Sequence, residues 1–302
     1  MMDGSKEQTA LLAREITRSG SIQTYYTAKL MVDKDLVDDF YRAYAYFRWI
    51  DDVIDISTRS SKERIHFTRM QSQLIDDLYA GKQVVDLQPE EKILRDLVAN
   101  DRGENSGLQS FIRNMFAIIE FDAHRKGRLI KNSELDWYVN TLGKSVTDGL
   151  LYFIGNGSPY PDSPLRYQAG VAAHISHLLR DNKRDSLDGF FNIPEEYLQQ
   201  HDLQPDDVNN PAYKDWVRQR VETARNLFTQ GKRYLDGLEV LRSKITGYWY
   251  CARFEVVLDT IEQDGYRLRA EYHERRQLMT WIKIFWIGLA VPVRHGLAKL
   301  LP

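Results

Sequence analysis

One helix-length stretch, residues 36–56, constrains the fold of this chain more than any other. It reads LVDDFYRAYAYFRWIDDVIDI and carries Tyr44, Arg48, Asp51 and Asp55 at spacings of four, three and four. On an α-helix these side chains fall within about 60° of one another, so they form a single polar stripe. Two carboxylates four residues apart repel each other, which favours a bound cation between them. The stretch therefore predicts an amphipathic helix with a cation-binding stripe.

The opposite side of the same stretch is apolar and is predicted to face a core through Phe40, Ala43, Phe47, Ile50 and Ile54. Helical spacing of apolar residues recurs along nearly the whole chain, whereas strand-like alternation is scarce. No long linker divides the sequence. We therefore expect an all-α fold and a single domain over residues 1–302.

Caps, glycines and prolines place the expected helix ends. The expected helices are 6–18, 22–30, 33–56, 60–80, 89–99, 106–126, 132–154, 164–185, 194–200, 211–238, 247–264 and 267–300, the last broken near Pro292.

A second stretch, residues 171–185, repeats the design of the first. It reads VAAHISHLLRDNKRD, and its residues His174, His177, Asp181 and Asp185 fall within about 80° on a helix. A solvated helix face is the simpler explanation for any single D-x-x-x-D pair, but two pairs in one helical chain favour a metal site. Four carboxylates facing each other across a bundle would bind divalent metal ions with room for an anionic ligand. Oxygen ligands of this kind suit Mg²⁺.

Composition excludes several classes of function. With 302 residues and a net charge of −2, the chain has no excess of basic residues for binding nucleic acid. The single cysteine, Cys251, cannot form an internal disulfide, which favours a reducing compartment. The amino end has no signal-peptide architecture, and no apolar run reaches the roughly 18 residues that span a bilayer. We expect a cytoplasmic protein, with membrane association left open.

The carboxyl end, residues 280–302, is predicted to be a membrane-surface or docking tail. It contains a ten-residue apolar run at 284–293, which is too short to span a bilayer. Basic and aromatic residues around this run suit an interfacial anchor, and docking onto the bundle is the equal alternative. These residues are Trp281, Lys283, Trp286, Arg294 and Lys299.

Three blocks of sequence carry a resemblance to a known family. They are YAYFRWIDDVID at 44–55, HISHLLRDNKRDSLDGFFNIP at 174–194 and CARFEVVLDTIEQDGYRL at 251–268. They resemble the two aspartate-rich motifs and the late helix of the squalene/phytoene synthases, the head-to-head prenyl transferases. Weaker matches are Tyr138 and the opening SIQTYY at 21–26. The resemblance covers most of the chain.

The resemblance implies an isoprenoid-synthase helical bundle with a central cavity. It implies that Mg²⁺, with Mn²⁺ as an alternative, is held against prenyl diphosphates and that Arg48 contacts a diphosphate directly. The implied catalytic residues are Asp51, Asp55, Asp181, Asp185 and Tyr138; the implied metal ligands are the same four aspartates with His177; and the implied substrate-binding residues are Arg48, Arg180, Tyr44, Thr24 and His174.

Three residues depart from the family pattern. Family members usually have Gln and Asn at the positions of His174 and His177, and an arginine at the position of Phe190. The Asn position normally helps to hold metal, so His177 either replaces that ligand or leaves the role. Imidazole is a less natural ligand for Mg²⁺ than oxygen. The arginine replaced by Phe190 would have contacted diphosphate.

The expected function is the Mg²⁺-dependent head-to-head condensation of two farnesyl or geranylgeranyl diphosphates through a cyclopropylcarbinyl diphosphate. The alternatives are a terpene cyclase or a transferase that stops at the cyclopropyl intermediate, and a non-catalytic helical assembly protein. The segment GNGSP at 155–159 lacks the glycines and preceding strand of a nucleotide fingerprint. The use of NADPH stays open, because the family's reductant site has no such motif.

Overall fold

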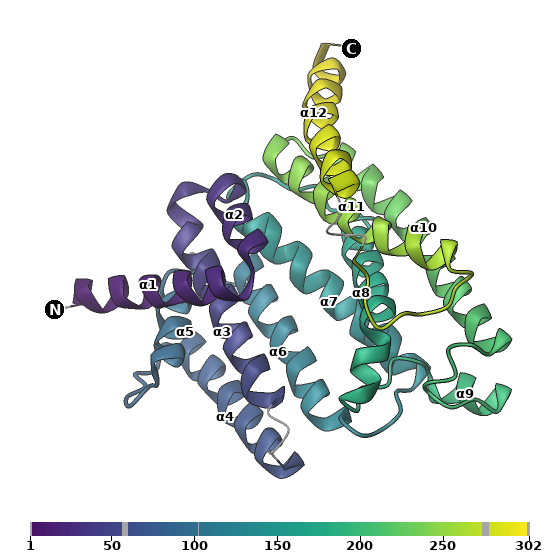
Figure 1. Cartoon of the computed structure of the whole chain (residues 1–302). Coiled ribbons are helices and arrows are strands. Elements are labelled where there is room, and N and C mark those ends of the chain that lie inside the picture. The colour runs from purple at the N-terminus through teal and green to yellow at the C-terminus, as the bar shows by residue number, and fades with distance from the viewer. Residues whose placement is uncertain (1, 56–59, 102, 274–277, 301–302) are drawn as a thin grey trace. The chain divides into compact units, whose positions relative to one another are not determined.

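The computed structural model describes residues 2–55, 60–101, 103–273 and 278–300. For residues 2–5, 278–281, 283–284 and 297–300 it describes the backbone alone. Within these residues the secondary structure is helical, and the only β-type pairing is an isolated bridge between Ile130 and Pro194. Figure 1 shows the helices in chain order. The helices are α1 (Met2–Gly20), α2 (Ile22–Met31), the 3₁₀ turn η1 (Lys34–Leu36), α3 (Val37–Asp55), α4 (Ser61–Tyr79), α5 (Pro89–Ala99), α6 (Gly107–Arg125), α7 (Asn132–Phe153), α8 (Gln168–Leu187), α9 (Glu195–His201), α10 (Pro211–Asp236), α11 (Leu241–Gln263) and α12 (Leu278–Leu300).

Local sequence signals set many of these boundaries. Ser60 and Glu63 form a reciprocal capping box at the start of α4. Proline occupies the first turn of α5 and of α10, where its missing N–H costs nothing. The expected all-α fold is confirmed.

Two expected helix starts differ most from the structure, and the helices expected from 33 and 164 begin at Val37 and Gln168. Gly247 lies inside α11, which begins at Leu241, because this glycine serves packing: a Cβ there would lie 2.5 Å from Leu235 Cδ2. The last helix begins at Leu278 and not at residue 267, and it continues through Pro292 without the expected break. A proline inside a helix removes one backbone hydrogen bond, which a local bend can accommodate.

The chain forms two compact units. Unit 1 comprises residues 1–124 and 148–157, and unit 2 comprises residues 125–147 and 158–302. The first aspartate-rich stretch therefore belongs to unit 1 and the second to unit 2.

The core of unit 1 is built around α3. All five of its predicted core residues contact the apolar core: Ala43, Phe47, Ile50 and Ile54 are buried, and Phe40 is partly buried against them. Phe47 also packs edge-on against Phe111 of α6, with ring centroids 5.3 Å apart. Burial of this face leaves the polar stripe of α3 pointing away from the core.

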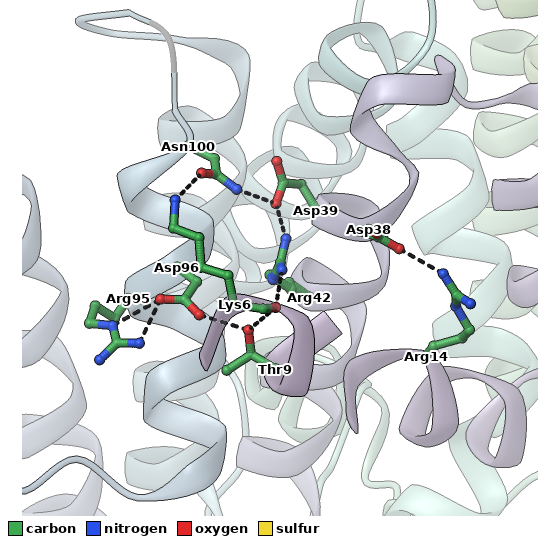
Figure 2. A network of polar contacts seen from close by, with 9 residues as sticks. All are labelled: Lys6, Thr9, Arg14, Asp38, Asp39, Arg42, Arg95, Asp96 and Asn100. Atoms are coloured by element: carbon green, nitrogen blue, oxygen red, sulfur yellow. Dashed lines mark hydrogen bonds and ion pairs between the residues drawn. The ribbon is translucent and has the colours of Figure 1, made fainter. Parts of the chain in front are cut away.

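Polar contacts fasten α1 to α3 and α5 in unit 1 (Figure 2). Arg42 donates to Asp39 at 2.6 Å and to the carbonyl oxygen of Lys6 at 2.9 Å. Thr9 donates to Asp96 at 2.7 Å. The side chains of Asp39, Arg42 and Asp96 are buried, so these charge-assisted bonds hold the start of α3 in one position.

Three glycines hold α8 close to its neighbours in unit 2, and we call them the glycine clasp: Gly143 of α7, Gly170 of α8 and Gly231 of α10. A Cβ at Gly231 would lie 2.4 Å from the backbone nitrogen of Ala169, and one at Gly143 would lie 2.7 Å from that of Val171. A Cβ at Gly170 would lie 2.6 Å from the carbonyl oxygen of Gly143. Backbone approach this close requires glycine. The clasp fixes the helix that carries Asp181.

Candidate active site

The polar stripe of α3 is present as predicted. Asp51 and Asp55 are both exposed and lie one turn apart at the end of the helix. The surrounding protein, then the carboxylates of Asp55 and of Asp122 on α6, raise the pKa of Asp51 to about 7. Asp51 is nevertheless exposed, so a cation from solvent can reach its carboxylate. A cation bound here would relieve that repulsion.

Arg48 contacts a carboxylate in this structure. Its guanidinium donates to Asp52 through Nε at 3.2 Å and through Nη2 at 2.5 Å. Both side chains are about half exposed, so the pair contributes little to stability. Arg48 can therefore exchange Asp52 for a more highly charged anion at small cost.

Tyr44 and Thr24 both form hydrogen bonds with Ser21. Ser21 caps α2 and accepts hydrogen bonds from the backbone N–H of Thr24 at 3.2 Å and from its hydroxyl at 2.8 Å. The Ser21 side chain also hydrogen-bonds Tyr44, whose pKa is raised chiefly by desolvation. The Thr24 hydroxyl thus donates to the N-cap residue of α2, and Tyr44, the first residue of the polar stripe, lies beside it.

Asp181 of α8 has two hydrogen-bonding partners on its own helix. Arg180 donates to both of its oxygens, at 2.7 and 2.5 Å, and His177 Nε2 lies 2.9 Å from Oδ2. Burial opposes ionisation of Asp181, but the hydrogen bonds from Arg180 and His177 outweigh it, so the pKa of this carboxyl lies well below its usual range. His177 therefore contacts the predicted metal ligand Asp181 directly.

Asp185 lies one turn further along α8, and its pKa is shifted upward whereas that of Asp181 is shifted downward. Burial and the nearby charge of Asp181 raise the pKa of Asp185 to about 7, although Asn192 donates a 2.8 Å hydrogen bond to its Oδ2. The second stripe, like the first, thus contains one carboxylate whose negative charge lacks full compensation.

His174 is buried, with 7% of its surface exposed, and its ring stacks on His177 at a centroid distance of 6.2 Å. Its Nε2 makes no hydrogen bond among the described residues. Burial, and then the neighbouring His177, lower the pKa of His174 to about 3, so the imidazole is neutral at physiological pH.

Sequence reasoning missed a buried arginine beside Asp185. Arg125, at the end of α6, is 3% exposed and donates to Asn192 Oδ1 at 3.1 Å. Its guanidinium lies 5.1 Å from the ring centroid of Tyr138 and 5.2 Å from that of Phe190. No spacing rule could find it, because Arg125 precedes Asp185 by 60 positions and lies in neither motif.

Arg125 lies beside Phe190, one of the three residues expected to depart from the family pattern. Lys126 also lies over the Phe190 ring, at 5.1 Å. Positive charge is therefore present around Phe190 although the residue itself is apolar. The Tyr138 ring is buried against the same guanidinium, which links the predicted catalytic tyrosine to the Asn192–Asp185 pair.

The donor set fits Mg²⁺. Both stripes offer carboxylate oxygens, and Asp51 and Asp185 each have uncompensated negative charge. In the described part of the chain, no three His, Cys, Asp or Glu side chains form a ready-made metal group. Mg²⁺ in enzymes is commonly bound by one or two carboxylates with substrate phosphate oxygens completing the shell, so such a group is not required.

The fold matches solved structures of one enzyme class. Squalene synthase HpnC from Alicyclobacillus acidocaldarius is 20% identical, with a TM-score of 0.70 over 88% of this chain and 99% of that one. A dehydrosqualene synthase in complex with ligand is 15% identical, with a TM-score of 0.69 over 95% of this chain and 96% of that one. At these identities the likeness establishes the all-α squalene-synthase fold alone.

Sequence comparison then gives the family. The 15-cis-phytoene synthase of Synechocystis is 23% identical over 95% of this chain and 87% of its own length. The squalene/phytoene synthase family matches residues 18–281, and the chain belongs to this family. Its members are prenyltransferases that act on prenyl diphosphates and use divalent metal ions, so the protein is an enzyme of isoprenoid biosynthesis.

Among the described helices, none is long and apolar enough to cross a membrane. The predicted tail is the helix α12, but the side chains of Trp281, Lys283 and Lys299 lie outside the described residues.

Proposed function

We propose that this enzyme condenses two farnesyl or geranylgeranyl diphosphates head to head, through a cyclopropylcarbinyl diphosphate, in a reaction that depends on Mg²⁺. The observation that carries the proposal is the pairing of guanidinium groups with under-compensated carboxylates on two helices. Arg48 lies on the same stripe as Asp51, and Arg180 lies beside Asp181 on the helix of Asp185. Such stripes suit metal-bridged diphosphates.

Each predicted residue has a proposed role. Asp51, Asp55, Asp181 and Asp185 would ligate the metal, and Mn²⁺ could replace Mg²⁺. When bound, the metal would neutralise the leaving diphosphate. Arg48, on exchanging Asp52 for diphosphate, would fix its orientation with a bidentate fork.

The reaction balances without a further reactant in its first half. The C–O bond of one allylic diphosphate breaks, and diphosphate leaves with the electron pair. The double bond of the second molecule captures the allylic cation, and loss of a proton closes the cyclopropane ring. We propose Tyr138, held by Arg125, as the catalytic tyrosine, and Tyr44, Thr24, Arg180 and His174 as substrate contacts.

His177 has two proposed roles that the family resemblance leaves open. It can ligate the metal in place of the family's asparagine, or it can remain on Asp181. Its 2.9 Å contact with Asp181 Oδ2 favours the second, because a metal ion would compete for the same oxygen.

One observation favours a related reaction on the same fold. His174 places a neutral imidazole with an unpaired Nε2 where relatives have an amide. This change suits an enzyme that stops at the cyclopropyl intermediate, or a cyclase, in which the second half-reaction differs. Membership of a family of enzymes and the retention of all four aspartates argue against a non-catalytic assembly protein.

Incubating the purified chain with Mg²⁺ and farnesyl or geranylgeranyl diphosphate tests the proposal. We expect diphosphate release and a C30 or C40 product joined head to head, or its cyclopropylcarbinyl diphosphate. Parallel reactions with and without NADPH identify the reductant requirement, and reactions with EDTA or Mn²⁺ identify the metal. Absence of diphosphate release from every prenyl chain length would contradict the proposal.

Replacing Arg125 is expected to lower turnover about tenfold or more, because Asn192, Asp185 and Tyr138 lose a buried charged partner. Arg125→Met removes the charge and the fork, whereas Arg125→Lys keeps the charge and should recover part of the activity. Loss of the guanidinium also raises the pKa of Asp185 further, so the acidic limb of the pH–rate profile should shift upward.

The pH profile separates this role from simple destabilisation. Thermal unfolding of both variants gives the structural contribution, and assays run well below the melting temperature give the catalytic one. An unchanged profile in Arg125→Met would show that the arginine serves packing alone.

We further propose that the protein works in the cytoplasm, with peripheral contact to a membrane through its C-terminal segment. No nucleic-acid partner is proposed.

A further inference from the structure

Within unit 2, the described side chains of α12 contact α11 along one side of the helix. Val291 is buried, and a Cβ at Gly288 would lie 3.1 Å from Trp249 of α11. His295 Nδ1 lies 3.2 Å from Lys244 Nζ, also on α11. These three positions fall within about 60° on the helix, so α12 docks on α11 through a narrow strip.

The opposite side of α12 is apolar and exposed. Phe285 is 64% exposed, Trp286 63% and Val293 61%, and Leu289 and Ile282 are 47% and 38% exposed. These five residues fall within about 100° on the helix, and their centre lies about 140° around the helix from that of the docked strip. We call them the α12 apolar face. Large exposed side chains gathered on one face are uncommon where a surface meets only water.

The charge of α12 indicates what covers this face. The sequence of α12 has no Asp or Glu and contains Lys283, Arg294 and Lys299, a formal charge of +3. The whole chain has a net charge of −2, so the remaining residues sum to −5, from −2 minus +3. A basic helix on an otherwise acidic chain is complementary to an anionic surface.

We infer that α12 binds the surface of an anionic phospholipid bilayer, with its apolar face inserted at the boundary between headgroups and acyl chains. Tryptophan and phenylalanine favour this boundary, and basic residues bind the anionic headgroups. The helix lies on the bilayer and does not cross it, in agreement with the absence of a spanning helix among the described residues. The α12 apolar face is thus the part of the C-terminal segment that makes the proposed membrane contact, and anionic phospholipid is its ligand. This inference does not depend on which prenyl product the enzyme makes.

Co-sedimentation of the full chain with vesicles tests the inference without any substrate. The vesicles are pure phosphatidylcholine, or phosphatidylcholine with 30 mol% phosphatidylglycerol, each at about 0.1 M and 0.5 M salt. We expect binding to the anionic vesicles at low salt and weaker binding to the neutral vesicles. High salt should reduce binding to the anionic vesicles because it screens the headgroup charge.

The variant Phe285→Ser/Trp286→Ser should bind anionic vesicles about tenfold more weakly, because both exposed rings are lost. Its fold should persist, since neither side chain is buried. The matched control, Met70→Ser/Val85→Ser, also removes two exposed apolar side chains, which are 55% and 78% exposed, and should bind like the wild type.

Three outcomes would overturn the inference. One is equal binding by the α12 variant and the wild type, and another is no binding of the wild type to anionic vesicles. The third is a dimer in solution that the α12 variant converts to a monomer, since a second copy would then cover the apolar face. Failure of the prenyl-transfer assay with intact vesicle binding would refute the proposed reaction and leave this inference standing.

Discussion

Asp51→Asn is expected to lower turnover by about 100-fold or more, because the amide cannot supply the anionic oxygen that binds the metal. The substitution is nearly isosteric, and Asp51 is exposed, so circular dichroism should show an unchanged helical content. Steady-state diphosphate release measures the effect. Asp38→Asn is the matched control: Asp38 lies on the same helix in an exposed ion pair with Arg14, and its loss should leave turnover unchanged.

Without metal, Asp51→Asn should make the folded protein more stable at high pH, although it lowers activity. The pKa of Asp51 is about 7 in the folded protein, against 3.8 for an unperturbed aspartate. Between these values the folded state binds more protons than the unfolded state, so this group makes stability fall as pH rises towards 7. Asp51→Asn removes that loss, and we expect a modest rise in melting temperature at pH 8 and almost none at pH 4.

With Mg²⁺ present, the wild type should gain more thermal stability than Asp51→Asn. Mg²⁺ should raise the melting temperature of the wild type more at pH 8 than at pH 6, because the carboxylates must be ionised to bind it. The Asn variant should gain less. Full activity in Asp51→Asn, or equal stabilisation of both proteins by Mg²⁺, would exclude this residue as a metal ligand.

Gly231→Val is expected to destabilise the protein by about 3 kcal/mol, at the upper end of what overpacking costs. The nearest atoms to the new Cβ are the nitrogen, Cβ and Cα of Ala169, at 2.4, 2.6 and 2.7 Å, and two of these three are backbone. Backbone cannot rotate away, so α8 and α10 must separate. Chemical denaturation measures the loss.

Displacing α8 also moves Asp181 and Asp185, so Gly231→Val should lose activity beyond its loss of folded protein. Gly103→Val is the control, because a Cβ at Gly103 meets no atom within 4 Å. If Gly231→Val matched this control in stability, the close approach of α8 and α10 would not be a feature of the protein in solution.

Residue spacing was sufficient to predict which helix faces are polar and which are apolar. The stripe of α3 and its core residues could be derived from the 3.6-residue period alone, since burial of one face fixes the direction of the other. The engagement of Arg48 by Asp52 was missed, although these residues are also four apart. Asp52 lies directly beside Asp51 but outside the pair of carboxylates four residues apart, so the pair alone does not predict its contact with Arg48.

Contacts between distant segments lay beyond sequence reasoning. Arg125, Tyr138 and Asn192 are far apart in the sequence but lie together in unit 2, and no periodicity encodes that packing. The start of α11 was missed for a related reason. Gly247 suggests a boundary by its low helix propensity, yet its role is to admit Leu235.

The surroundings of Phe190 affect how other members of the family should be compared. By the family resemblance, Phe190 replaces an expected arginine, and on sequence alone one predicted diphosphate contact is lost. In three dimensions the guanidinium of Arg125 and the ammonium of Lys126 both lie within 5.2 Å of the Phe190 ring. Homologues that lack the arginine are thus better classified by the total basic charge around that ring than by the letter at one aligned position.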